Sequence, residues 1–185
     1  GVMLPNTASI PAVHADRLRA SEETGTVAAK MAIQGGPKLD QLITEESVEN
    51  ALRVLLSVSG STNAIIHLTA IAGRAGVEVD LKRFNELSDE TPGLVDLKPV
   101  GTGYMEDFHS AGGLDGVLGA LASQLNLQTQ GVTGQSLEQR LQKDRSKQAD
   151  QSVIRTLQDP VDSQGGLIAL HGTLAPGCAI LKRAA

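Results

Sequence analysis

The side chains best suited to chemistry in this sequence are a glutamate and a histidine three positions apart, Glu106 and His109. On a helix this spacing places both on one face, one turn apart. Helical di-iron sites use two such Glu-x-x-His pairs together with two further acids, and this sequence has a single pair. The alternative is a solvated first turn, in which Glu106 and Asp107 interact favourably with the helix dipole. The residues alone leave both interpretations open.

A second polar cluster, Ser61-Thr62-Asn63, precedes an apolar stretch that ends at Gly76. Apolar residues at spacings of three and four predict a helix that is buried on most sides, with His67 as a core histidine. Ser61 or Thr62 can serve as its N-cap, and Gly76 can end it in the left-handed conformation. In the alternative, the buried helix N-terminus presents free amides and hydroxyls to an anionic ligand.

Other motifs for catalysis or binding are absent from the sequence. The histidines and the single cysteine, Cys178, lack the paired spacing of a zinc site. No Ser-His-Asp set, phosphate-binding loop or dinucleotide-binding glycine motif is found. Cys178 is expected to be a small buried hydrophobic residue. One cysteine excludes an intrachain disulfide and suits a reducing compartment, so we expect a cytoplasmic protein.

Composition excludes several partner classes. The formal net charge is −5 and no basic cluster is present, which argues against a nucleic-acid surface. No apolar run approaches the roughly 18 residues that a membrane span needs. With two Phe, one Tyr and no Trp, the core must consist of aliphatic residues.

The elements that position these residues are mostly helices. Helices are predicted over 12–34, 44–59, 61–76, 80–90, 114–125 and 136–141, and an exposed polar loop over 142–151. Short β-like runs are predicted at 94–97, 153–154, 166–170 and 178–181. The fold class is therefore α/β, mainly helical with short strands. The last part of the chain, about 35 residues, is expected to begin a second, β-rich unit.

Four motifs occur in an order that resembles one enzyme family. They are Leu4-Pro-Asn-Thr-Ala-Ser-Ile-Pro-Ala12, Ser59-Gly-Ser-Thr-Asn-Ala-Ile-Ile-His-Leu68, Asp96-Leu-Lys-Pro99 with Met105-Glu-Asp-Phe-His-Ser-Ala-Gly-Gly113, and Gly165-Gly-Leu-Ile-Ala-Leu-His-Gly-Thr-Leu-Ala-Pro176. In combination they resemble the dihydroxy-acid/sugar-acid dehydratase family, which includes 6-phosphogluconate dehydratase. The resemblance covers almost the whole chain.

The resemblance implies a lyase that removes water from a 2,3-dihydroxy acid, a small hydroxy acid or sugar acid, to give a 2-keto acid. Such enzymes serve sugar-acid metabolism or branched-chain amino acid biosynthesis. An iron–sulfur cluster and Mg²⁺ act as Lewis acids, and a serine removes the proton at carbon 2. The implied architecture is an α/β first domain, to which residues 1–145 would belong, and a barrel-like β domain that begins within 146–185. Dimers or tetramers are usual in the family.

The departures from the family are as informative as the match. The cluster cysteines and a Cys-Asp-Lys metal segment lie upstream of the Leu-Pro motif in the family, and the catalytic serine and a glutamate ligand lie downstream of the last motif. No catalytic or metal-binding residue can therefore be assigned here, and Cys178 does not fall at a ligand position. We expect an internal fragment that alone binds no cluster and is inactive, with Ser61, Thr62, Asn63, Glu106 and His109 adjacent to the substrate in the parent enzyme. The alternatives are a non-catalytic helical interaction module derived from the family, or one chain of a split enzyme.

Overall fold

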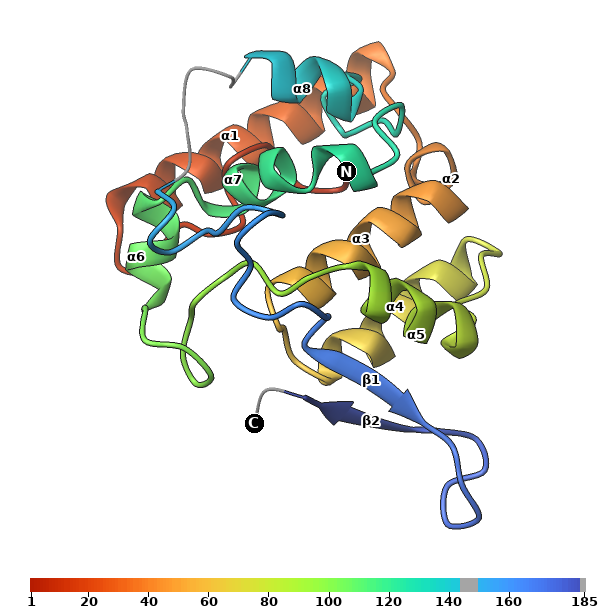
Figure 1. Ribbon diagram of the computed structural model, residues 1–185. Helices are drawn as coiled ribbons and strands as arrows, with labels where there is room; N and C mark the ends of the chain where they lie inside the picture. The colour runs from red at the N-terminus through yellow and green to blue at the C-terminus, as the bar shows by residue number, and fades with distance from the viewer. Residues whose placement is uncertain (144–149, 184–185) are drawn as a thin grey trace.

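The computed structural model describes residues 1–143 and 150–183. Within these residues the protein is mainly helical, with one short antiparallel sheet (Figure 1). The elements in chain order are α1 (Ala15–Gln34), α2 (Leu39–Leu42), α3 (Glu45–Ser57), α4 (Asn63–Arg74), α5 (Leu81–Glu90), α6 (Met105–Ser110), α7 (Gly113–Ala120), the 3₁₀ turn η1 (Ala122–Gln124), α8 (Leu137–Lys143), β1 (Leu167–Leu170) and β2 (Ala179–Lys182).

Helix α3 is shared by two hydrophobic cores. Leu52, Leu55 and Leu56 of α3 are buried in the first core, with α5 and β1. On the other side of the helix, Val54 and Val58 pack against the second core, which α6, α7 and the segment around Ile154 complete. The side chains in both cores are almost all aliphatic, as the composition requires.

The helix boundaries follow the capping chemistry expected from the sequence. The Thr44 hydroxyl accepts a hydrogen bond from the Ser47 amide at the start of α3, and Asp80 accepts one from the Lys82 amide at the start of α5. Before α8, Ser136 and Gln139 form a reciprocal capping box. Gly76 has φ = 79° and follows α4, where the Val77 amide bonds the Ala72 carbonyl in a Schellman arrangement.

Two expectations for α4 are wrong. Only Ile65 and Ala72 are buried, while Ile66 is 68% exposed and Ile71 is also exposed. His67 is exposed too, so it is not a core histidine. Helix α4 packs on α3 along one side, and its opposite side faces solvent.

Helix α1 also departs from the apolar pattern of its sequence. It ends at Gln34 as predicted but begins at Ala15 and not at Ala12. None of its residues is buried, and Leu18 and Ile33 are 76% and 83% exposed. The apolar side of this 20-residue helix is not covered by the described parts of the chain.

The β structure is smaller than predicted. β1 and β2 pair antiparallel with Leu167 opposite Lys182, and the hairpin projects from the helical body (Figure 1). The predicted runs 94–97 and 153–154 form isolated bridges instead of strands, and Val95 pairs with Ile154. Cys178 lies just before β2 and packs, half-buried, against the first core. The last two residues of the predicted β-rich unit, and most of the predicted loop 142–151, lie outside the described residues.

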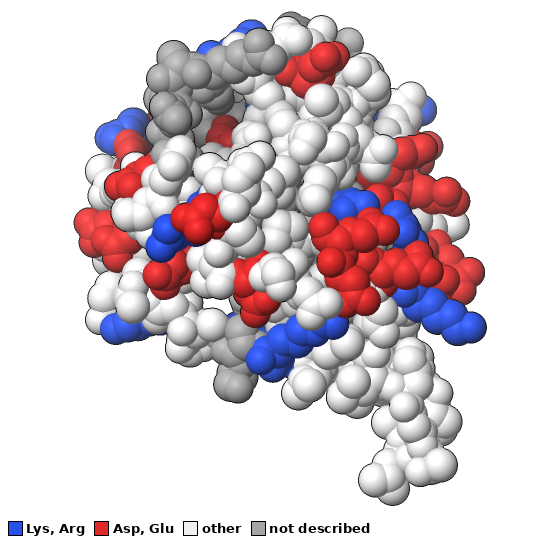
Figure 2. Space-filling model, viewed as in Figure 1, with Lys and Arg blue, Asp and Glu red and all other residues white. Residues whose placement is uncertain are grey.

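No helix among the described residues is long and apolar enough to cross a membrane. On the face shown in Figure 2, Lys and Arg side chains are scattered among acidic ones and form no continuous basic patch.

Candidate functional site

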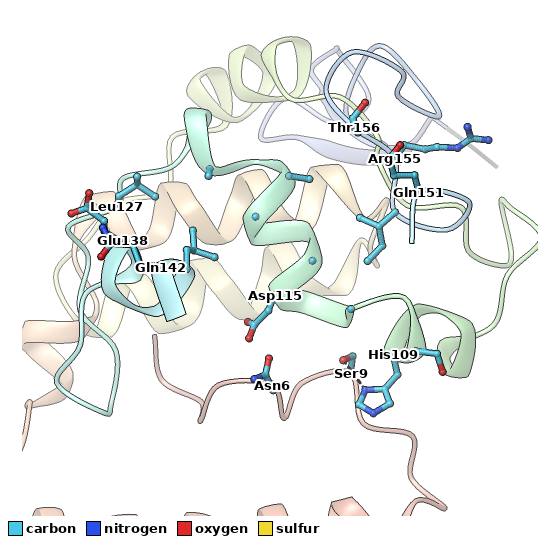
Figure 3. A pocket seen from close by; sticks show the side chains of 18 residues that line it. Asn6, Ser9, His109, Asp115, Leu127, Glu138, Gln142, Gln151, Arg155 and Thr156 are labelled. Atoms are coloured by element: carbon cyan, nitrogen blue, oxygen red, sulfur yellow. Dashed lines mark hydrogen bonds between the residues drawn. The ribbon is translucent and has the colours of Figure 1, made fainter. Parts of the chain in front are cut away.

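The candidate site is built around a serine and a histidine that lie 100 positions apart in the chain. Ser9 Oγ lies 3.2 Å from His109 Nδ1, and Ser9 is only 4% exposed. Figure 3 shows the His109 ring turned toward Ser9 at the edge of a cavity. The first and third sequence motifs therefore meet at this hydrogen bond.

The double glycine of the third motif makes this approach possible. Gly113 has φ = 56°, in the left-handed region that favours glycine. A Cβ atom at this position would overlap Ser9 Oγ. The absence of a side chain at Gly113 thus lets the buried serine reach the start of α7.

The loop that carries Ser9 is fixed by hydrogen bonds to backbone carbonyls. Arg17 of α1 donates to the Thr7 carbonyl at 3.3 Å and also to the Ile10 carbonyl, and the Thr7 hydroxyl donates to the Leu4 carbonyl at 2.8 Å. The two Arg17 bonds anchor the loop to the first turn of α1, and the Thr7 bond closes a turn within the loop. They hold Ser9 in place before any ligand binds.

The start of α1, with its N-cap residue, brings two more polar side chains to His109. The His14 and His109 rings meet edge to face, with centroids 5.7 Å apart. Asp16 lies beside His14, with Oδ2 3.9 Å from His14 Nδ1. His14, Asp16 and His109 therefore form one cluster at the junction of α1 and α6.

Helix α6 presents His109 from a well-anchored position. The Tyr104 amide donates to Asp107 Oδ2 at 2.7 Å, which closes the first turn of the helix. Phe108 of the same helix is buried in the second core and so attaches α6 to it. Glu106 is exposed on α6 and is not among the residues that line the cavity.

The cavity beside this cluster has a volume of about 760 Å³. Its walls come from the Ser9 loop, α7 and the segment 154–156, with part of α8 (Figure 3). Asp115 of α7 forms a close ion pair with Arg140 of α8, which joins two of these walls. A pocket of this size, with hydroxyl, imidazole and carboxylate groups at its edge, suits a small polar ligand.

The other sequence candidates lie elsewhere in the fold. At the start of α4, the Asn63 amide donates to Ser61 Oγ at 3.2 Å, and Thr62 makes no capping hydrogen bond through its side chain. None of these three residues lines the cavity next to His109. The structure thus brings Ser61, Thr62 and Asn63 together, but not with His109.

The preceding turn explains the position of the α4 start. Ser59 has φ = 49° and packs against Gly166, where a Cβ atom would lie 2.8 Å from Ser59 Cα. The Gly166 amide donates to the Leu56 carbonyl at 3.1 Å. The second motif therefore meets the fourth, just as the first meets the third.

Sequence reasoning missed three residues of the candidate site: Ser9, His14 and Asp16. Ser9 belongs to a recognised motif but has no spacing relation to His109, so no local pattern could pair them. For His14 and Asp16, the only local indication of a shared site was that both lie next to the start of a predicted helix.

A cavity of about 760 Å³ with a hydroxyl and an imidazole converging at its edge has the size and polar groups of a small-molecule binding site. Sequence comparison identifies the family of the protein. The family model described as "Dihydroxy-acid/6-phosphogluconate dehydratase N-terminal" matches residues 1–140, and the chain belongs to this family.

Several curated relatives match the entire chain. A protein named dihydroxy-acid dehydratase from Methanococcoides burtonii is 37% identical over 100% of this chain and 34% of its own length. Dihydroxy-acid dehydratase 2 of Corynebacterium efficiens is 38% identical, and the Methanospirillum hungatei dihydroxy-acid dehydratase is 40% identical, each over 33% of its length. The chain thus spans about a third of the length of the relatives it matches.

Proposed function

We propose that the protein to which this chain belongs is a hydro-lyase that dehydrates a 2,3-dihydroxy acid, either a dihydroxy or a sugar acid, to a 2-keto acid. The observation that supports this most directly is the alignment of the entire chain with proteins named dihydroxy-acid dehydratase. The pairing of distant family motifs supports it further, because Ser9 with His109 and Ser59 with Gly166 make close contacts across the fold.

The cofactors implied by the family do not fit the residues of this chain. An iron–sulfur cluster needs several cysteine thiolates, and the sequence offers Cys178 alone, packed half-buried against the first core. Magnesium prefers oxygen ligands, whereas the one possible metal-binding group among the described residues is two imidazoles with one carboxylate. The proposal therefore assigns the cluster, the Mg²⁺ and the catalytic serine to other parts of the parent enzyme.

Within that enzyme we assign positions next to the substrate to two groups of residues. One is Ser61, Thr62 and Asn63 at the start of α4, and the other is Glu106 and His109 on α6. Thr62 supports the first assignment because its hydroxyl is not used for capping.

The wider proposal includes a first domain over 1–145 and a β-rich second domain beginning within 146–185. It also includes a cytoplasmic homodimer or homotetramer that binds neither nucleic acid nor membrane.

The proposed function is tested with the complete protein, loaded with iron, sulfide and Mg²⁺. A panel of branched 2,3-dihydroxy acids and sugar acids is supplied, and 2-keto acid formation is measured. Turnover of one class establishes the reaction and selects the substrate. The absence of keto acid from every compound would overturn the proposal.

The role of the α4 start is tested by Thr62→Val in the same enzyme. We expect kcat to fall by about tenfold or more while the melting temperature changes little, because Thr62 makes no capping bond that valine would remove. Thr69→Val, on an exposed position of the same helix, is the matched control and leaves both quantities unchanged. If Thr62→Val lowers stability but leaves turnover normal, the role of this motif is purely structural.

The 185-residue chain alone is predicted to bind no cluster and to have no dehydratase activity. Incubation with iron and sulfide followed by visible absorption tests this, and a stoichiometric cluster would refute it.

The alternative of a non-catalytic interaction module is favoured by one observation, the exposed apolar side of α1. A cooperative monomeric melt of a separately expressed chain would support the module, and co-purification of a cysteine-containing partner would support a split enzyme.

A further inference from the structure

We propose that His14, Asp16 and His109 bind a divalent transition-metal ion such as Zn²⁺. Each residue offers one ligand atom, and these atoms all lie within 4.8 Å of one another. His14 Nδ1 and Asp16 Oδ2 are 3.9 Å apart. His14 is the N-cap residue of α1, Asp16 lies in its first turn and His109 lies on α6, so the ion would join segments about a hundred positions apart in the chain.

The spacing requires little movement to become a coordination shell. With Zn–ligand bonds of about 2.0–2.1 Å, tetrahedral ligand atoms lie roughly 3.4 Å from each other. The His14 and Asp16 side chains are partly exposed at the helix start, so rotation about their side-chain bonds can close the remaining gap. His109 is the fixed ligand, because its helix is anchored by Phe108.

Ser9 orients the fixed histidine for metal binding. When Ser9 Oγ accepts a hydrogen bond from Nδ1–H of His109, Nε2 keeps its lone pair free for the ion. Metal-binding histidines characteristically have such a partner on the second ring nitrogen. Ser9 is buried and faces Gly113, so this orientation exists before the ion arrives.

The chemistry of the ligand set selects the kind of ion. Two imidazoles and one carboxylate favour zinc, cobalt or nickel over Mg²⁺ and Ca²⁺. Asp16 Oδ1 forms a close ion pair with Arg19, which leaves Oδ2, the oxygen nearer His14, for coordination. Three protein ligands leave a coordination position for water or for a ligand from the neighbouring cavity.

The site is tested by titrating the 185-residue chain with Co²⁺, followed by visible absorption, and by displacing Co²⁺ with Zn²⁺. One ion per chain with a four- or five-coordinate spectrum is expected. His14→Ala and His109→Ala are expected to weaken binding at least tenfold. His67→Ala, which removes an exposed histidine from α4, is the matched control and leaves the affinity unchanged.

Ser9→Ala tests the positioning role separately. It is expected to weaken Co²⁺ binding by about tenfold and to shift the ¹⁵N signals of the His109 ring toward the other tautomer, while Ser9→Thr restores both.

His14 is exposed and lies outside both cores, so His14→Ala remains informative if His109→Ala does not fold. The proposal is overturned if the wild-type chain binds no stoichiometric ion, or if His14→Ala binds as tightly as the wild type. The dehydratase assay does not enter this test, so the two proposals fail independently.

Discussion

Arg53 shows how a single charged residue can be buried on α3. It is 7% exposed, and it donates to Thr91 Oγ1 at 3.0 Å and to Glu90 at 2.9 Å. It also bonds Glu49 one turn earlier on α3. A guanidinium can be buried here because all its contacts are charge-assisted or hydroxyl hydrogen bonds.

We predict that Arg53→Ala lowers the free energy of unfolding by about 1–3 kcal/mol, because it removes these bonds and leaves Thr91 buried without its donor. Urea denaturation of the chain measures the change. Arg83→Ala is the control, since Arg83 contacts the same acids from a partly exposed position and is expected to cost less than about 1 kcal/mol. Equal effects of the two changes would contradict the role given to burial.

Gly113→Ala is predicted to cost about 2–4 kcal/mol, from left-handed backbone strain and from overlap with Ser9 Oγ. Gly119→Ala on the same helix is the control, because a Cβ atom there would meet nothing within 4 Å beyond the neighbouring backbone of its own helix. That change is expected to stabilise α7 by about 0.5 kcal/mol. Thermal denaturation compares the two, and a neutral Gly113→Ala would show that the loop carrying Ser9 can move away at little cost.

At the scale of elements, local chemistry predicted the helix boundaries that have a capping residue, whereas the helix expected over 114–125 ends at Ala120. The starts at Thr44, Asp80 and Ser136 and the end at Gly76 each depend on side chains within four positions, so the sequence contains the needed information. The exposed faces of α1 and α4 could not be predicted in the same way. An apolar stripe indicates that a helix can be covered, but not whether the described chain covers it.

The cap of α3 gives a prediction with two readouts. Thr44→Ala is expected to lower the free energy of unfolding by about 1 kcal/mol, because the Ser47 amide loses its acceptor. It should also raise the pKa of Glu46, which the Glu46 backbone amide and the Thr44 hydroxyl hold below its ordinary value of 4.5. Thr44→Ser retains both effects of the wild type.

The sign of the pH dependence follows from the lowered pKa of Glu46. The ionised carboxylate stabilises the folded chain above pH 4.5, and this contribution is lost as the pH falls through the lower folded pKa. In Thr44→Ala that acid-sensitive contribution is expected to shrink. Carboxyl NMR titration measures the pKa, and an unchanged Glu46 pKa would rule out the hydroxyl as a cause.

At the scale of the whole molecule, the candidate site depends on contacts that no local pattern encodes. His109 and the α4 start were identifiable because each lies in a distinctive motif. The approach of Ser9 and His14 to His109 requires the loop before α1, α6 and α7 to pack together. The predicted proximity of the α4 residues to the same substrate remains a proposal, because none of them lines the cavity beside His109.

The two cores and the exposed helix also predict where this chain tolerates change. Lysine at both Leu18 and Ile33 is expected to alter the free energy of unfolding by less than about 0.5 kcal/mol per site, because both side chains are already solvated. Leu56→Ala, at a fully buried position of α3, is expected to cost about 2–5 kcal/mol. Urea denaturation of the 185-residue chain measures both.

The same double lysine variant tests whether the exposed apolar side of α1 mediates self-association. In the isolated chain, its apolar residues are available for self-association, so the lysines are expected to increase solubility and reduce any dimer detected by sedimentation. If the lysines instead destabilised the monomeric chain by several kcal/mol, α1 would have to pack on the rest of the molecule in solution. The arrangement of an uncovered helix beside two closed cores would then be wrong.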